Sequence, residues 1–129
     1  WPAATAVQAG NQLAVAIAGY DPVSYFGEGP TRGEARFSHF WNGAVWYFAS
    51  EENRDAFAAA PETYAPAYDG YCSWAASQGY KAPGDPLVDA VEDGRLFLQV
   101  HPRAQELWQA DASGHIAQGD GNWPRIHPF

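Results

Sequence analysis

The side chains best suited to chemistry in this sequence are a single thiol, Cys72, and four histidines. Thiolate and imidazole groups are the ligands that soft or borderline metal ions such as Cu(I) and Zn(II) prefer. The first functional hypothesis is therefore a metal site that uses Cys72 with His39 as its partner. The expected cofactor is one copper or zinc ion.

Two interpretations of Cys72 stay open at this stage. The sequence predicts a helix that is initiated by Asp69 or Gly70 and comprises Tyr71 to about Gln78. This start places the Cys72 thiol in the first turn of the helix. There the helix dipole favours the reactive thiolate. However, Ala75 and Ala76 follow at helical spacing on the same face, and small apolar neighbours favour a buried, structural cysteine.

The remaining histidines have simpler interpretations. His101 precedes a proline at a predicted helix start and is in place to cap that helix, whereas His115 and His127 are expected to be solvated. The sequence contains no C-x-x-C, H-x-x-H or H-E-x-x-H spacing, no G-x-S-x-G motif and no glycine-rich phosphate loop. We therefore predict a protein that is not an enzyme.

Overall composition narrows the class of partner. The 129 residues carry a formal net charge of −8, which argues against nucleic acid because nucleic-acid binding needs a basic surface. No segment approaches the roughly 20 apolar residues needed to cross a bilayer, so no membrane span is expected. The chain length suits a single domain, 1–129, and an acidic surface keeps such a domain soluble.

A hairpin followed by a helix, residues 37–64, is the predicted centre of the fold. Asn42-Gly43 separates two aromatic-rich runs and suits a two-residue turn, because both of its residues must adopt positive φ. This register places His39 opposite Trp46 and Phe37 opposite Phe48 on an aromatic face. Ser50 is a good N-cap for the helix that follows, which ends at Pro61.

Shorter elements are expected on both sides of this unit. The alternation of Leu13 to Ile17 predicts a strand, and Asp93-Gly94 predicts a second hairpin joining 88–92 to 95–100. Pro102 opens a predicted helix to about Asp111, and a last short helix begins near Ser113. Residues 1–12 are expected to form an N-terminal arm and 119–129 a C-terminal tail. The predicted class is α+β: a small single domain with antiparallel hairpins flanked by short helices.

Several sequence motifs resemble those of one known family. The resemblance is carried by residues 18–26 (AGYDPVSYF), by the hairpin and helix with its P-E-x-Y ending, by 64–75 (YAPAYDGYCSWA), by 79–86 (GYKAPGDP) and by 122–124 (NWP). Together they resemble the YHS domain, a small module often associated with metals, and in particular exported bacterial YHS domain-containing proteins. The sequence has Asp21 and Ser50 near places where metal-linked members carry cysteine. The resemblance implies a YHS-like fold and a periplasmic or secreted location.

Two functions follow as expectations. One is an exported, non-enzymatic binding module that holds a soft transition metal through Cys72. The alternative is an accessory or scaffold subunit that binds another exported protein through aromatic surface, since Trp, Tyr and Phe are abundant and aromatic side chains are enriched at interfaces. For this alternative, an exposed apolar patch that includes residues such as Phe40, Tyr47, Trp74 and Tyr80 would be the expected feature.

Overall fold

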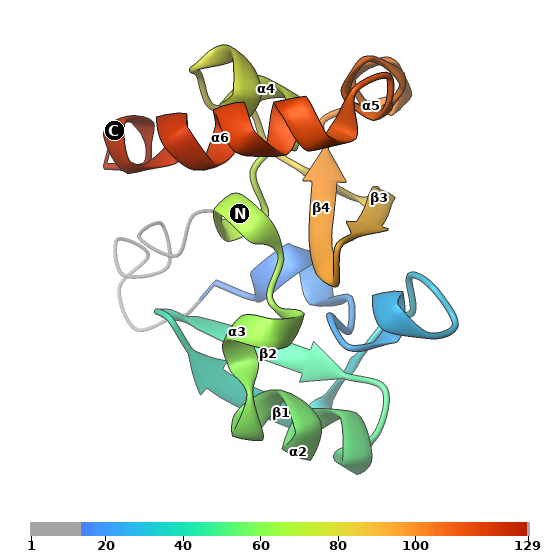
Figure 1. Ribbon diagram of the computed structural model, residues 1–129. Helices are drawn as coiled ribbons and strands as arrows, with labels where there is room; N and C mark the ends of the chain where they lie inside the picture. Colours follow the sequence, from blue (N-terminus) through green and yellow to red (C-terminus); the bar gives the residue numbers. More distant parts are fainter. Residues whose placement is uncertain (1–13, 129) are drawn as a thin grey trace. The chain divides into compact units, whose positions relative to one another are not determined.

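The computed structural model describes residues 14–128, and these confirm the predicted α+β class with antiparallel hairpins flanked by short helices. The chain divides into two compact units, Trp1–Ala65 and Pro66–Phe129 (Figure 1). Among the described residues, each unit contains one two-stranded antiparallel sheet. We call them the first and the second unit and describe each by itself.

The first unit is built on the hairpin of β1 (Glu34–Trp41) and β2 (Ala44–Phe48). Asn42 and Gly43 form the turn with φ of 53° and 76°, which confirms the predicted two-residue connection. His39 pairs with Trp46, as expected from that register.

One part of the predicted register is wrong. Phe37 was expected opposite Phe48, but Glu34 takes this position because the pairing shifts between Glu34 and Ser38. An irregularity of this kind inserts extra residues into one strand. The first strand consequently begins three residues earlier than the aromatic run predicts.

Two helices follow the hairpin, α2 (Glu51–Ala59) and α3 (Pro61–Tyr64). Ser50 caps α2 by accepting a hydrogen bond from the Asn53 amide, as predicted. Phe57 of α2 is fully buried against the hairpin, with its ring 5.0 Å from that of Trp46 and 5.1 Å from that of Phe48. This aromatic cluster is the core of the first unit on the α2 side.

The strand expected at Leu13–Ile17 does not form over its described part. The chain turns through the 3₁₀ segment η1 (Ala16–Gly19), in which Ile17 and Ala18 adopt positive φ. Val15 alone bridges to the hairpin, at Val45. Leu13 and the predicted arm at 1–12 lie outside the described residues. A second 3₁₀ segment, η2 (Ser24–Phe26), leads towards β1.

The second unit opens with η3 (Ala67–Gly70) and the short helix α4 (Ser73–Gln78). The helix was expected to start at Asp69 or Gly70, but these residues belong to η3, where Asp69 has positive φ. Cys72 is therefore the N-cap residue of α4 and does not lie in its first turn. The second hairpin, β3 (Asp85–Glu92) and β4 (Arg95–Gln99), turns at Asp93-Gly94 as predicted.

The last two helices are α5 (Pro102–Gln109) and α6 (Ala112–Ile126). The prediction of a tail at 119–129 is therefore wrong for residues 119–126, which belong to α6. Asp111 caps α6, and the ring of Trp123 packs against that of Tyr68 with the centroids 5.6 Å apart, so packing extends the helix through its glycines. Figure 1 shows α6 running beside α4. No helix among residues 14–128 has the length and apolar character that a membrane crossing requires.

Candidate functional site

Cys72 is fully buried in the core of the second unit. Its Sγ donates a hydrogen bond to Oε1 of Gln99 at 3.4 Å, and the same oxygen accepts the backbone N–H of Trp74 at 2.9 Å. Ala75 and Ala104 pack around the thiol. Of the two interpretations of Cys72, this environment fits the buried structural residue.

The histidines are distributed over different structural roles. His39 lies on β1, half-buried, with its ring 6.2 Å from that of Phe57, and it belongs to the first unit whereas Cys72 belongs to the second. His101 caps α5 by accepting the Ala104 amide at 3.0 Å, as the sequence predicts. Within the part of the chain that the structure describes, no three His, Cys, Asp or Glu side chains gather as a metal site would need.

A cleft of a size suited to a ligand lies in the first unit. It has a volume of about 550 Å³, within the range typical of small-molecule sites. Three segments form it: η2 with the loop after it, the connection from β2 into α2, and the end of α3. The lining residues are Val23, Ser24, Phe26, Gly27, Glu28, Thr31, Ala49, Ser50, Asn53 and Tyr64.

Asp21, whose carboxylate is fully buried, does not line this cleft but is hydrogen-bonded to residues that do. Its Oδ1 accepts the N–H of Val23 at 2.8 Å. Its Oδ2 accepts the N–H of Ala49 at 2.9 Å and the side-chain amide of Asn53 at 2.7 Å. All of these donors are N–H groups, so the ionised carboxylate is the form whose hydrogen bonding is satisfied.

The backbone of Asp21 forms hydrogen bonds with two further lining residues, Thr31 and Ser24. Its N–H donates to the Thr31 carbonyl at 2.8 Å, and its carbonyl accepts the Ser24 hydroxyl at 2.7 Å. Every described residue that forms a hydrogen bond with Asp21 thus lines the cleft. Because these contacts join segments up to 32 residues apart, the cleft is held in shape before any ligand arrives.

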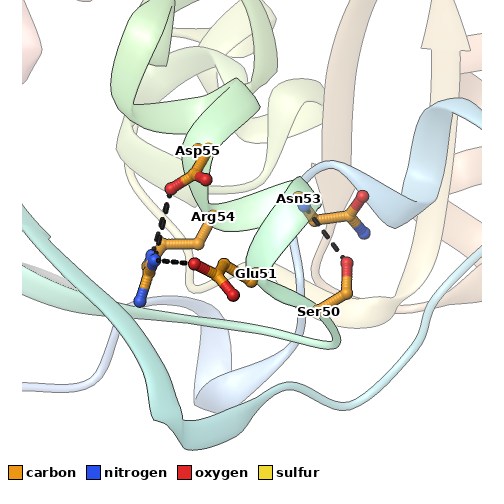
Figure 2. Close-up of polar contacts among 5 residues, drawn as sticks. All are labelled: Ser50, Glu51, Asn53, Arg54 and Asp55. Atoms are coloured by element: carbon orange, nitrogen blue, oxygen red, sulfur yellow. Dashed lines mark hydrogen bonds and ion pairs between the residues drawn. The ribbon is translucent and has the colours of Figure 1, made fainter.

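The basic side chains of the first unit are engaged elsewhere. Arg32 lies over the Tyr20 ring at 5.0 Å, and Arg36 pairs with Glu34 at 3.2 Å. Figure 2 shows the guanidinium of Arg54 between two carboxylates of α2, on the side of the helix away from the Asn53 side chain. No Lys or Arg of the described chain lines the cleft.

A different network organises the second unit. Arg95 makes two hydrogen bonds to the Asp120 carboxylate, at 2.9 and 3.0 Å, and Tyr68 donates its hydroxyl to the same group at 2.9 Å. The hydrogen bonds from Arg95 lower the pKa of Asp120 below its ordinary value. Burial, with the hydrogen bond to Asp120, raises the pKa of Tyr68. These groups connect η3, β4 and α6 and are best understood as structural.

Most of the described aromatic side chains are buried or half-buried within their own unit. Tyr68 is buried, and Tyr47 and Trp74 are half-buried. Phe40 and Tyr80 are 57% and 52% exposed, but they belong to different units. Among the residues that the structure describes, these two exposed aromatic side chains therefore do not share a patch within one unit, and the scaffold function gains no support from them.

Sequence reasoning missed Asp21 as the organiser of a site. An aspartate followed by proline predicts only a local helix cap, and the bond from the Val23 amide to Asp21 fits that role. The contacts to Ala49 and Asn53 bring together segments that no local pattern connects.

A comparison with protein-family models, curated proteins and solved structures finds no match for this chain, and membership of the YHS family stays a prediction.

Proposed function

We propose that this chain is a non-enzymatic binding module that holds a small polar molecule in the cleft of the first unit. The observation that carries the proposal is the buried Asp21 carboxylate, whose hydrogen-bond partners all line the cleft. Burying a charge is costly unless the charge is well hydrogen-bonded. The hydrogen bonds that compensate the buried Asp21 charge also hold the lining residues in place, and they thereby fix the shape of the cleft.

The composition of the lining favours binding over catalysis. Its titratable side chains are Glu28, which is exposed, and Tyr64. A nucleophile with an adjacent base is not among the residues that line it, and Asp21 is fully buried and already accepts three N–H donors. Phe26 and Tyr64 meet edge to face at 5.5 Å and give the cleft an apolar side beside its hydroxyl and amide groups.

The metal hypothesis receives less support from the geometry. A metal ion at Cys72 would have to displace the Gln99 hydrogen bond and enter a fully buried core. The polar cleft is open without any such rearrangement. We therefore place the binding function in the first unit.

The test is an NMR titration of the full chain with three matched probes: benzylamine, benzyl alcohol and benzoate. Saturable shifts of the amides of Gly27, Thr31 and Asn53 with at least one probe are expected. Val23→Trp should fill the cleft and remove these shifts, because Val23 lines it in an ordinary helical conformation. The control, Ala58→Trp, adds the same side chain on the exposed side of α2 and should leave them unchanged. The absence of a saturable response to all three probes would overturn the proposal.

A further inference from the structure

Hydrogen bonding inside the first unit determines which polar atoms remain available in the cleft. Asn53 directs its side-chain amide nitrogen to Asp21 at 2.7 Å, which fixes the orientation of the group. Its Oδ1 then has no partner among the described residues and is available only as an acceptor. The buried carboxylate therefore sets the chemistry of a lining residue as well as its position.

The hydroxyl groups of the lining follow the same pattern. Ser24 donates its hydrogen to the Asp21 carbonyl at 2.7 Å, and Thr31 donates its hydrogen to the Gly29 carbonyl at 3.0 Å. Each oxygen retains lone pairs for a ligand. Glu28, exposed on the loop, adds a carboxylate. Ser50 differs, because its oxygen accepts the Asn53 amide and its hydrogen remains to be donated.

We propose that the ligand of this cleft is a small organic ammonium compound whose N–H groups bind the acceptors of Ser24, Thr31 and Asn53. This inference rests on the proposed function and names its ligand class. Glu28 at the cleft and the buried Asp21 beside it both favour a positive charge, and the arginines of the first unit are engaged with other groups. The apolar part of the ligand lies against Phe26 and Tyr64, whose ring faces also attract cations.

The matched probes separate this inference from the proposed function. Benzylamine should bind roughly tenfold more tightly than benzyl alcohol, because charge-assisted hydrogen bonds exceed neutral ones by about that factor. Benzoate should bind most weakly. Equal binding of the amine and the alcohol would leave the proposed function standing and overturn the ammonium inference. Failure of all probes would overturn both.

A fourth probe tests the acceptor pattern directly. Benzyltrimethylammonium carries the positive charge and the ring but has no N–H donor. It should bind several-fold more weakly than benzylamine, and equal binding would show that the acceptors of the lining do not select the ligand. Phosphatidylethanolamine vesicles present the same ammonium on a lipid. Recruitment to vesicles without any response to free benzylamine would overturn the proposal of a free ligand.

Two variants with matched controls locate the binding. Thr31→Val removes one acceptor and keeps the side-chain shape, and it should weaken benzylamine binding by about fivefold. Thr63→Val, at an exposed position of α3 outside the lining, should have no effect. Glu28→Gln should weaken binding by about threefold at low salt and less at high salt, because the group is exposed. Glu62→Gln makes the same charge change outside the lining, and an equal loss in this control would contradict a local role for Glu28.

Discussion

The most informative perturbation is Asp21→Asn, because it keeps the shape of a fully buried side chain and changes only its hydrogen bonding. Val23, Ala49 and Asn53 present three N–H donors to the two oxygens. The amide of the variant has one acceptor oxygen and one donor nitrogen. At least one donor must therefore lose its acceptor.

The least costly arrangement can be identified from the geometry. Placing the amide oxygen at the Oδ2 position keeps the contacts to Ala49 and Asn53 and leaves the Val23 N–H facing another donor. A buried donor without a partner costs about 1–3 kcal/mol, and the two remaining bonds lose their charge assistance. Relief of the buried charge offsets part of this cost. We expect a net loss of about 2–4 kcal/mol in the free energy of unfolding.

The assay is urea unfolding at neutral pH, followed through NMR signals assigned to each unit. The loss should appear in residues of the first unit, because every contact of Asp21 described above lies there. Asp55→Asn is the control, since this carboxylate of α2 is exposed and its ion pair with Arg54 contributes less than about 1 kcal/mol. A loss below about 0.5 kcal/mol for Asp21→Asn, equal to that of the control, would refute the reasoning.

Three predictions concern the second unit. Burial and the hydrogen bond to Asp120 raise the pKa of Tyr68, so its contribution to stability is complete below pH 10.0, the ordinary value, and is lost as pH rises through the higher folded-state pKa. Alkaline unfolding of Tyr68→Phe should lack this added loss, and identical pH profiles for parent and variant would contradict it. The Cys72 thiol should resist labelling by a thiol reagent until the protein unfolds, because it is fully buried. If the protein instead binds one equivalent of Cu(I) or Zn(II), and Cys72→Ser abolishes this binding, the metal hypothesis would be restored. Gly119→Ala should lower stability by about 1–3 kcal/mol, because the new Cβ would lie 2.5 Å from the Tyr68 hydroxyl. Gly121→Ala, with open space around it, should raise stability by up to about 1 kcal/mol, and equal effects would exclude this steric explanation.

Local signals in the sequence predicted those elements that depend on neighbouring residues. Asn42-Gly43 requires only its own positive φ values, and Ser50 caps α2 through a contact three residues away. The α+β class and both hairpin turns followed from such patterns. The predicted pairing of His39 with Trp46 also depends only on the position of the turn.

The features that sequence reasoning missed depend on packing between distant segments. The last helix continues to Ile126 because Trp123 packs against Tyr68 and Tyr71, which outweighs the poor helix propensity of its glycines. The environment of Cys72 depends on Gln99, which arrives from β4. Neither partner can be identified from spacing along the chain.

Asp21 shows how one such contact links the fold to the proposed function. A leucine at this position would fill the core without the desolvation cost of a charge, but it would leave the Val23 and Ala49 amides without acceptors. It would also free the Asn53 amide to rotate, so that its nitrogen rather than its oxygen could face a ligand. The carboxylate is thus needed less for burial than for orientation. Stability and ligand choice should therefore change together in Asp21→Leu, whereas Asp21→Asn, which keeps an acceptor for the Asn53 amide, should mainly lower stability. Thr31→Val should change ligand binding with little effect on unfolding.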